Sequence, residues 1–309
     1  MTWSAPCRNA GKLPQGRLYG LATREPLLRV NKEVRTTIRG FKVRIYPTKE
    51  QERKMWRHLG ASRYIWNYML DLQQSNYRSG EKHLSAFDMN KLITLLKQGD
   101  EHKWLYEVSN TMLQRTCSDL NEAYTRFFHK TSGMPRFKSR KRSKPSFPVS
   151  TENFYFKDEK VLNIEKIGKV KYKTDFEFQY GKGVCKYSNA RVSYEQASGK
   201  WYVSFGKECE NQAHELTYIK MGIDLGVKDL AVVEFNGEQI TFHNINKSKR
   251  MRSLKKKLKH TQRSISRKYE QNRQGNKFVK TKNIEKEEQK LRKIYKKMDG
   301  IRKNYLHQT

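Results

Sequence analysis

Asp224 is the first residue whose setting could support catalysis. It lies in the apolar segment MGIDLGVKDLAVVEF (residues 221–235), where Gly222 and Gly226 leave room for a ligand or another backbone to approach. A carboxylate at the end of a strand can hold one of two Mg²⁺ ions that activate an attacking water and stabilise a leaving oxygen. One acid cannot build such a centre, and an aspartate that caps a turn would look the same. On these residues alone, both interpretations stay open.

A second candidate site is a basic loop, defined here as residues 136–147. Its six cations are Arg136, Lys138, Arg140, Lys141, Arg142 and Lys144. No acidic residue lies between Lys130 and Ser150, so these charges repel one another unless a polyanion binds. Cationic side chains neutralise phosphates and release counterions, and the flanking Phe137 and Phe147 could stack on unpaired bases. The pattern favours phosphate contact over the alternative of a solvated, flexible loop.

A third set of cations follows a predicted helix in residues 247–309, a segment with 23 basic and 5 acidic residues. The polar face of this helix carries Lys255, Lys256, Lys257, Lys259, Arg263, Arg267 and Lys268. Apolar positions recur every three or four residues and resume after a loop that contains Gly275. We therefore predict two amphipathic helices that fold back on each other, with the apolar stripe as their packing seam.

Composition indicates the kind of partner. The chain has 309 residues, enough for about two domains, and its 65 Lys and Arg against 31 Asp and Glu leave a net charge of +34. Hydrophobic residues (36%) and aromatic residues (12%) suffice for packed cores, unlike in a disordered basic tail. Because the charge is spread over several segments, it fits a nucleic acid better than a membrane surface or an acidic protein.

Several classes of protein are disfavoured. No run approaches the roughly 18 consecutive apolar residues of a spanning helix, and the first 35 residues lack the apolar core of a signal peptide. These features predict a cytoplasmic, nucleoid-associated protein. The four cysteines, Cys7, Cys117, Cys185 and Cys209, never form a C-x-x-C pair, which predicts reduced thiols and no zinc ribbon in this chain. The histidines show no paired metal-ligand spacing, and no phosphate-binding glycine motif is present.

Local patterns predict the elements that position these candidates. Residues 36–46 alternate as a half-buried strand that Pro47 ends, and Thr48 with Gln51 forms a capping box at a helix start. Helices are predicted at residues 48–75, around 92–96, and at about 111–129. Residues 1–35 show no periodicity and are interpreted as an irregular basic leader without assigned chemistry.

Strands are predicted in two further stretches of the chain, one before and one after residue 211. Six short alternating runs between residues 153 and 206, FEFQY at 176–180 among them, predict an antiparallel sheet or barrel that the first strand joins. The helical block would then be an insertion into this sheet. Further on, the step Asn236-Gly237 between two apolar runs predicts a tight β-hairpin.

In this order the segments resemble the OrfB/TnpB family, proteins encoded by small bacterial and archaeal transposons and related to type V CRISPR nucleases. The resemblance extends over about residues 36–309 and is carried by FKVRIYPTKEQ (41–51), GMPRFKSRK (133–141), WYVSF (201–205), MGIDLGVKDLAVV (221–233) and SLKKKLKHTQRSISRK (253–268). It implies an α+β fold, in which a β-barrel wedge domain with an inserted helical lobe precedes a partial RNase H/RuvC-like α/β domain that carries a basic helical hairpin. The implied boundaries are 36–46 and 148–213 for the barrel, 47–135 for the recognition lobe, 136–147 for the basic loop, and 217–309 for the RuvC-like domain with its hairpin at 247–309.

The resemblance also implies an activity. In that family a guide RNA from the transposon end directs DNA cleavage beside a short motif, and base pairing supplies most of the specificity. Nuclease-active members continue past the hairpin into a strand with a catalytic Glu, a four-cysteine zinc ribbon and a final Asp. Since this sequence ends at Thr309, we expect a C-terminally truncated member. Asp224 would then be the first ligand of an incomplete triad, and Mg²⁺ would bind only if that site is completed.

Two further expectations concern the last segment. The acids Glu270, Glu285, Glu287, Glu288 and Asp299 lie on the predicted helices or their loop, where they should balance neighbouring lysines rather than join a metal site. A RuvC-like sheet that is cut short should also expose a strand edge and part of an apolar face.

Three hypotheses follow. The leading one is a transposase-family protein that binds guide RNA and DNA but lacks a complete nuclease centre. The first alternative is an active RNA-guided, Mg²⁺-dependent DNA endonuclease whose missing half comes from a continuing frame or a second polypeptide. The second alternative is a non-guided basic protein that binds RNA or DNA through charge alone.

Overall fold

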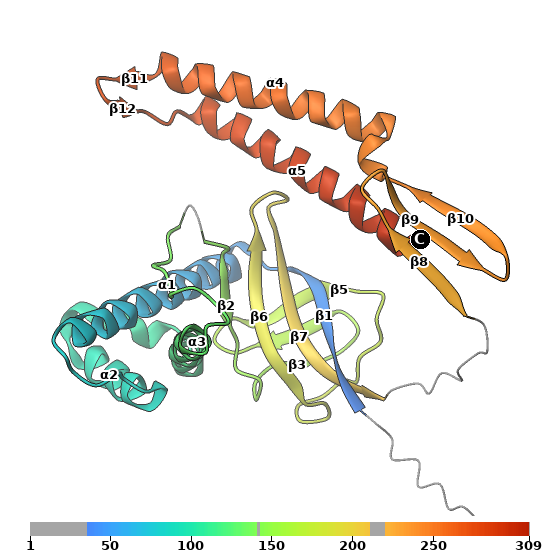
Figure 1. Cartoon of the computed structure of the whole chain (residues 1–309). Coiled ribbons are helices and arrows are strands. Elements are labelled where there is room, and N and C mark those ends of the chain that lie inside the picture. The colour runs from blue at the N-terminus through green and yellow to red at the C-terminus, as the bar shows by residue number, and fades with distance from the viewer. Residues whose placement is uncertain (1–35, 141–142, 211–219, 309) are drawn as a thin grey trace, which may run out of the picture. The chain divides into compact units, whose positions relative to one another are not determined.

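The computed structural model describes residues 36–140, 143–210 and 220–308. Predictions for residues 1–35, and for Lys141 and Arg142 in the basic loop, therefore lie outside the described residues. The fold is mixed α/β, with one large antiparallel sheet, a helical block, a smaller sheet and a pair of long helices (Figure 1).

The large sheet has seven strands in the order β2-β6-β7-β1-β5-β4-β3. Their bounds are β1 (Thr36–Tyr46), β2 (Ser146–Pro148), β3 (Tyr155–Phe156), β4 (Val161–Ile164), β5 (Gly168–Lys173), β6 (Tyr187–Glu195) and β7 (Lys200–Glu210). Strand β1 lies between β5 and β7 and pairs antiparallel with both. The first strand thus joins the sheet as predicted, and the helical block is inserted between β1 and the strands that follow.

Aromatic side chains fill the inside of this sheet and show that it is strongly rolled. Phe156 of β3 lies 5.5 Å from Phe205 of β7 between ring centroids, although three strands separate β3 from β7 in the sheet order. Phe154, just before β3, packs edge-on at 5.4 Å against Tyr187 of β6. The end strands β2 and β3 share no ladder within the described residues, so the expected barrel is a rolled sheet with two free ends.

The prediction of a strand at residues 176–180 is wrong. This segment has no regular structure, yet Phe178 is buried and stacks on Phe156 at 4.4 Å between ring centroids. Phe176 packs edge-on against Phe41 of β1 at 5.2 Å. The alternation of the sequence here reflects aromatic side chains that fill the rolled sheet, without a backbone ladder.

The inserted block consists of α1 (Lys49–Arg78), α2 (Ala86–Gln98), the 3-10 helix η1 (Asp100–Glu107) and α3 (Asn110–Phe128). The predicted capping box is confirmed, because Gln51 N donates to Thr48 Oγ1 (3.3 Å) and Thr48 N donates to Gln51 Oε1 (3.0 Å). The core continues from the helices into the sheet, where the rings of His58 of α1 and Phe147 of β2 pack with their centroids 5.3 Å apart.

The smaller sheet is a meander of β8 (Met221–Leu225), β9 (Asp229–Phe235) and β10 (Glu238–His243) in the order β10-β9-β8. Asn236 and Gly237 link β9 to β10 with φ angles of 50° and 81°. Positive φ at both central residues is what a type I′ hairpin turn requires. The predicted Asn-Gly hairpin is therefore confirmed.

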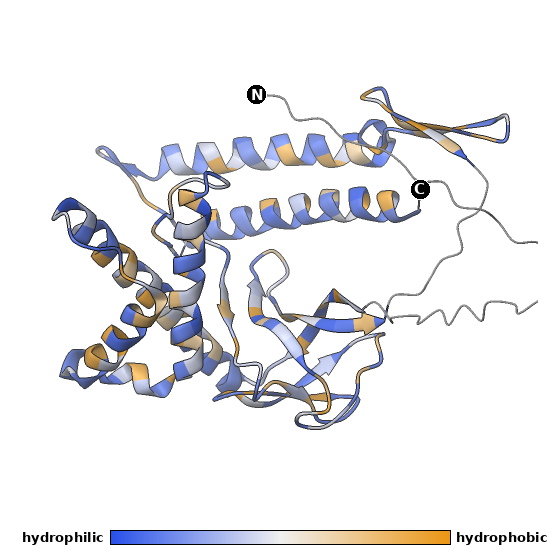
Figure 2. Cartoon of the chain, turned by 60° about the horizontal axis from the view of Figure 1, so that its bottom comes forward, coloured by the Kyte–Doolittle hydropathy of each residue, from blue (hydrophilic) through white to orange (hydrophobic). Residues whose placement is uncertain are grey.

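The predicted helical pair is also confirmed. After the short helix η2 (Ile245–Lys247), α4 (Lys249–Gln271) and α5 (Lys282–Gln308) pack together, and the strands β11 (Arg273–Gln274) and β12 (Lys277–Phe278) pair at their connection. Their shared core has only three buried apolar side chains: Met251, Leu254 and Met298. Figure 2 shows hydrophilic residues over most of both helices. Among the described residues, no helix is long and apolar enough to cross a membrane.

Replacing Phe156 with Ala should lower the free energy of unfolding by about 3–5 kcal/mol, because loss of a fully buried ring with five aromatic neighbours leaves a cavity. Urea denaturation followed by circular dichroism measures this loss. Phe176→Ala is the matched control, since that ring is half-exposed and should cost much less. Equal losses in the two variants would contradict the rolled aromatic core.

Candidate nucleic-acid interface

The basic loop is pinned to helix α1 by hydrogen bonds. The indole Nε1 of Trp66 donates to the carbonyl oxygen of Arg136 (3.0 Å). The side chain of Asn67 donates to the carbonyl oxygen of Lys138 (2.9 Å) and accepts from the Lys138 backbone N–H (2.7 Å). An amide side chain that bonds both backbone groups of one residue fixes that residue's orientation. The start of the loop therefore has a defined path.

The end of the loop joins the large sheet. Phe147 of β2 pairs with Val192 of β6, and Tyr194 N donates to the carbonyl oxygen of Pro145 (3.0 Å). Phe147 is only 1% exposed, so the expectation that it stacks on a base is wrong: its ring is part of the core. Phe137 is 52% exposed and stays available for such a contact.

The cations of the basic loop fall into two kinds. Arg136, Arg140 and Lys144 are exposed, and their side chains make no hydrogen bond or ion pair with any residue that the structure describes. Lys138 differs, because its Nζ lies 3.3 Å from the centre of the Trp66 ring in a cation–π contact. Three of the four described cations can thus meet a phosphate directly, while Lys138 faces inward.

Burial changes the protonation of Lys138. Desolvation lowers the pKa of its ammonium group to about 8, which nearby Asp119 opposes and nearby Arg191 reinforces. The face of Trp66 also favours the charged form. Lys138 therefore helps to attach the loop to α1, a role that its sequence context did not reveal.

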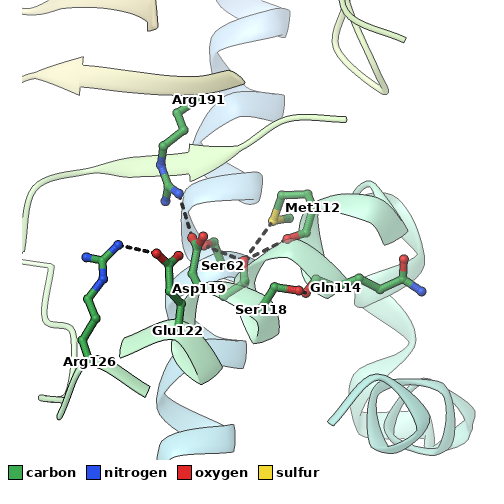
Figure 3. Close-up of polar contacts among 9 residues, drawn as sticks. Ser62, Met112, Gln114, Ser118, Asp119, Glu122, Arg126 and Arg191 are labelled. Carbon is green, nitrogen blue, oxygen red and sulfur yellow. Dashed lines mark hydrogen bonds and ion pairs between the residues drawn. The ribbon is translucent and has the colours of Figure 1, made fainter. Parts of the chain in front are cut away.

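Two sets of polar contacts join α1, α3 and β6 (Figure 3). Arg191 of β6 forms an ion pair with Asp119 of α3 at 2.7 Å. Ser62 of α1 and Thr116 of α3 are linked by a hydrogen bond of 3.1 Å, and Thr116 donates to the Met112 carbonyl oxygen (2.9 Å). Both residues of the Ser62–Thr116 pair are buried, so the bond satisfies groups that would otherwise be costly to bury. The loop is thus supported by α1, α3 and β6 together.

Helix α4 carries the second group of unpaired cations. Of the seven cations predicted on its polar face, five are exposed and have side chains without a hydrogen bond or ion pair in the described part of the chain: Lys256, Lys257, Lys259, Arg263 and Arg267. Lys255 donates to the Asn246 carbonyl oxygen (3.4 Å), and the half-buried Lys268 forms an ion pair with Glu287 at 3.3 Å. The first acidic residue of α4 is Glu270, near its end. Most of this helix therefore presents positive charge without internal compensation.

The expectation that the late acids balance lysines is confirmed. Glu287 pairs with Lys268 and Lys290, while Glu288 pairs with Lys280 at 2.7 Å. The remaining ion pairs of these acids are Glu270–Arg273, Glu285–Lys280, Glu288–Arg292 and Asp299–Lys303. Hydrogen bonds from neighbouring lysines lower the pKa of Glu287, so its carboxylate stays ionised. These acids are engaged within the helical pair and its loop.

Asp224 lies exposed on β8, directly opposite Val232 of β9. Glu234 lies opposite Gly222 in the same register, so it shares a sheet face with Asp224 as its diagonal neighbour. The sequence analysis missed Glu234, because its place beside Asp224 depends on the register between β8 and β9. Both carboxylates offer oxygen ligands of the kind that Mg²⁺ prefers. A two-metal centre needs more ligands than these, and the described residues contain no cluster of three or more metal-binding side chains.

The opposite face of the small sheet is apolar and open. Met221, Ile223 and Leu225 alternate with Asp224 along the edge strand β8 and are 60%, 58% and 77% exposed. This agrees with the expectation of an exposed edge and apolar face.

The cysteines within the described residues are Cys117, Cys185 and Cys209, all free thiols. Burial raises the pKa of Cys117 to about 12, so that thiol stays protonated and unreactive. Cys7 lies outside the described residues.

Two family models match the chain. A model described as a helix-turn-helix domain of OrfB proteins matches residues 37–82, and one described as a probable transposase of the OrfB type matches residues 192–309. Within residues 37–82 the structure has the strand β1 and one helix, α1, because α2 begins only at Ala86. A strand and a single long helix therefore occupy the segment whose description names two helices.

Two curated relatives are 29% identical to the chain. One, from Escherichia coli (strain K12), is named "Putative RNA-guided DNA endonuclease InsQ" and aligns over 273 residues, 88% of this chain and 62% of the relative. The other, from Streptomyces pristinaespiralis, is named "Putative RNA-guided DNA endonuclease" and aligns over 230 residues, 74% of this chain and 55% of the relative. The chain thus spans less than two thirds of the length of both.

Two solved structures are similar in part. A Cas12f1–sgRNA–target DNA complex matches with a TM-score of 0.48 at 12% identity, covering 87% of this chain and 76% of that one. A CRISPR–Cas12f ternary complex matches with a TM-score of 0.34 at 13% identity, covering 78% of this chain and 57% of that one.

Replacing Lys138 with Met tests whether this ammonium group is buried. The folded-state pKa of Lys138 is about 8, below the ~10.4 of an exposed lysine, so between these values the unfolded chain holds the extra proton. Wild-type stability should therefore rise relative to that of Lys138→Met as the pH increases from about 8 to about 10. Urea midpoints of both proteins at about pH 7 and about pH 9.5 measure this difference. A difference that does not change with pH would contradict the burial of Lys138.

Proposed function

Because the chain belongs to the OrfB/TnpB family of transposon-encoded proteins, we propose that it binds a guide RNA together with DNA through the basic loop and the polar face of α4. The observation that carries the proposal is a set of eight exposed cations without internal partners within the described residues: Arg136, Arg140, Lys144, Lys256, Lys257, Lys259, Arg263 and Arg267. In a chain with a net charge of +34, these cations repel one another. Bound phosphates neutralise them and relieve the repulsion, which favours binding.

The proposed guide is an RNA made from the transposon end. Both curated relatives carry names that specify RNA-guided DNA endonucleases, and this chain is similar to 62% and 55% of their lengths. Guide pairing would select the DNA sequence, while the protein holds the backbones by charge. In this proposal the rolled sheet is the wedge domain, the helical block is the recognition lobe, and the small sheet with α4 and α5 is the RuvC-like part. A protein bound to DNA in this way would be found with the nucleoid.

We propose Asp224 as one ligand for Mg²⁺, with Glu234 as its neighbour on the same sheet face. The described residues do not fit a complete two-metal centre, because such a centre needs further carboxylates that point to the same place. The chain described here would therefore bind nucleic acid without cutting it. An active endonuclease completed by further polypeptide, and a basic protein that binds without a guide, are the alternatives that the experiments below separate.

Neutralising the unpaired loop cations should weaken nucleic-acid binding and flatten its salt dependence. In the triple variant Arg136→Gln, Arg140→Gln and Lys144→Gln, the slope of log K against log salt should fall by about 0.7–0.9 for each lost phosphate contact. Fluorescence anisotropy with a labelled RNA over a range of salt concentrations measures the slope. The control is Lys54→Gln, Lys103→Gln and Lys303→Gln, which removes the same charge from ion-paired lysines. An equal change in both triple variants would show that net charge matters and the loop does not.

When the chain is expressed from its native locus and purified, it should carry a bound RNA of defined sequence from the transposon end. The complex should bind DNA that matches this RNA and leave it uncut in Mg²⁺, because the described residues do not supply Asp224 with the further ligands of a two-metal centre. Sequencing of the bound RNA and a cleavage assay measure both outcomes. Cleavage that Asp224→Ala abolishes would favour the endonuclease alternative. Random bound RNA would favour the non-guided alternative.

A further inference from the structure

Helix α1 and the 3-10 helix η1 form the walls of a cleft of about 880 Å³. This volume lies in the range of ligand pockets in proteins. The lining residues that matter here are Arg57, Gly60, Arg63, Tyr64, Tyr68 and Trp104. All six come from α1 and η1, so the cleft belongs to the inserted helical block alone.

One wall of the cleft is a set of aromatic rings held in place. Tyr64 and Tyr68 stack with centroids 6.0 Å apart and an interplanar angle of 24°. Trp104 meets Tyr64 edge-on at 5.5 Å and 72°, and its side chain is exposed. The hydroxyl of Tyr64 hydrogen-bonds to His102 Nε2 at 2.6 Å, which fixes the central ring. Rings that are already ordered present flat faces to a ligand at little entropic cost.

The polar groups of the cleft include an unpaired guanidinium. Arg57 is engaged in an ion pair with Glu107. Arg63 is half-buried and makes no hydrogen bond or ion pair with any described residue. It also lines a second cleft, to which Arg140 and Lys144 of the basic loop contribute. Arg63 therefore connects the aromatic wall with the cationic surface proposed above to hold nucleic acid.

Gly60 lies beside Arg63 and lines both clefts. It is well inside the 30-residue helix α1, where glycine lowers helix stability relative to alanine. A Cβ atom added at Gly60 would meet nothing within 4 Å, so the packing of this protein does not require a glycine there. The position leaves helix backbone bare at the junction of the two clefts. This is what close approach of an external group requires.

We propose that the cleft between α1 and η1 binds one unpaired nucleotide of a single-stranded nucleic acid. The base stacks on the aromatic wall at Trp104 and Tyr68, and its phosphate lies over Gly60 within reach of Arg63. The inference rests on the proposed nucleic-acid binding, since the strand reaches the cleft from the basic loop. Stacking depends on the π-face that all bases share, so the site tolerates any base. A free guanidinium matches a phosphate, and flat aromatic faces match a base, which together fit a nucleotide better than a peptide.

The site can be tested with single-stranded oligonucleotides that contain 2-aminopurine, whose fluorescence is quenched when the base stacks on an aromatic ring. The full chain should bind them and quench the signal. Trp104→Ala should weaken binding about 5-fold to 150-fold and abolish the quenching, because stacking on an aromatic side chain accounts for that range. The control Tyr106→Ala removes an exposed ring of the same helix η1 that does not line the cleft, and should bind like wild type. For charge, Arg63→Gln should weaken binding while Arg53→Gln, on the same helix outside the cleft, should not.

Gly60 supplies a readout that separates ligand approach from folding. Gly60→Ala should raise the thermal unfolding midpoint, because alanine is the better helix residue and meets no neighbour. Gly60→Leu should weaken oligonucleotide binding more than Gly60→Ala, since the larger side chain occupies the place of the phosphate. A lowered melting midpoint in Gly60→Ala would instead assign the glycine to packing and overturn this part of the proposal.

The outcomes keep this inference apart from the proposed function. If wild type binds oligonucleotides and the loop triple variant weakens binding, while Trp104→Ala and Gly60→Leu still bind and quench like wild type, the cleft is not a nucleotide site and the proposed function stands. If wild type binds no oligonucleotide, both fail together. The same sequence made as RNA and as DNA identifies the strand, and selective sensitivity of one of them to Trp104→Ala assigns the cleft to that strand.

Discussion

The antiparallel pairing of β1 with β7 is the interaction on which the rest of the described structure depends. Ten register pairs join these strands, from Thr36 with Glu210 to Ile45 with Trp201, although the whole helical block lies between them in the sequence. The block follows β1 at its start and leads into β2 at its end, and β2 pairs with β6, the neighbour of β7, so both ends of the block are attached to one sheet. Glu52 of α1 accepts hydrogen bonds from Trp56 and from Trp201 of β7, which places the helix against the strand. Everything that α1 carries, the anchors of the basic loop included, takes its position from this contact.

The charges of the chain are divided between two uses. Acidic residues of the helical pair form ion pairs within it, as in the contact of Glu287 with Lys268 that connects α5 to α4. Among the described residues, the unpaired cations Arg136, Arg140 and Lys144 of the loop and those of the long helix α4 lie where the backbone is already ordered. Ordered cations bind a polyanion with less loss of entropy than flexible ones, because their positions are set before the partner arrives. A rigid support under positive charge thus explains why one chain needs both aromatic cores and a large excess of Lys and Arg.

The features that could be predicted from the sequence have local causes. The capping box at Thr48 and the turn at Asn236-Gly237 depend on neighbouring residues, and the helical pair follows from apolar spacing along each helix. The features that were missed depend on segments far apart in the chain. Lys138 and Arg140 look alike in the sequence. They differ in the structure because the side chain of Lys138 lies over the Trp66 ring, while that of Arg140 is exposed. The irregular path around Phe178 similarly follows from the rolling of the sheet. Asp224 and Glu234 were both placed on strands, but the pairing that puts them on one sheet face was not predicted.

The small core of the helical pair ties its stability to its surroundings. Three buried apolar side chains bring α4 and α5 together, while the cations along α4 push against one another. A ligand that binds only the folded pair stabilises it by an amount that grows with ligand concentration over its dissociation constant. In the proposed function nucleic acid is that ligand, so the folded population of the pair would grow with the supply of nucleic acid. In the cell, newly made chains would complete this region in the presence of nucleic acid, so that assembly of the complex and maturation of the protein become one event.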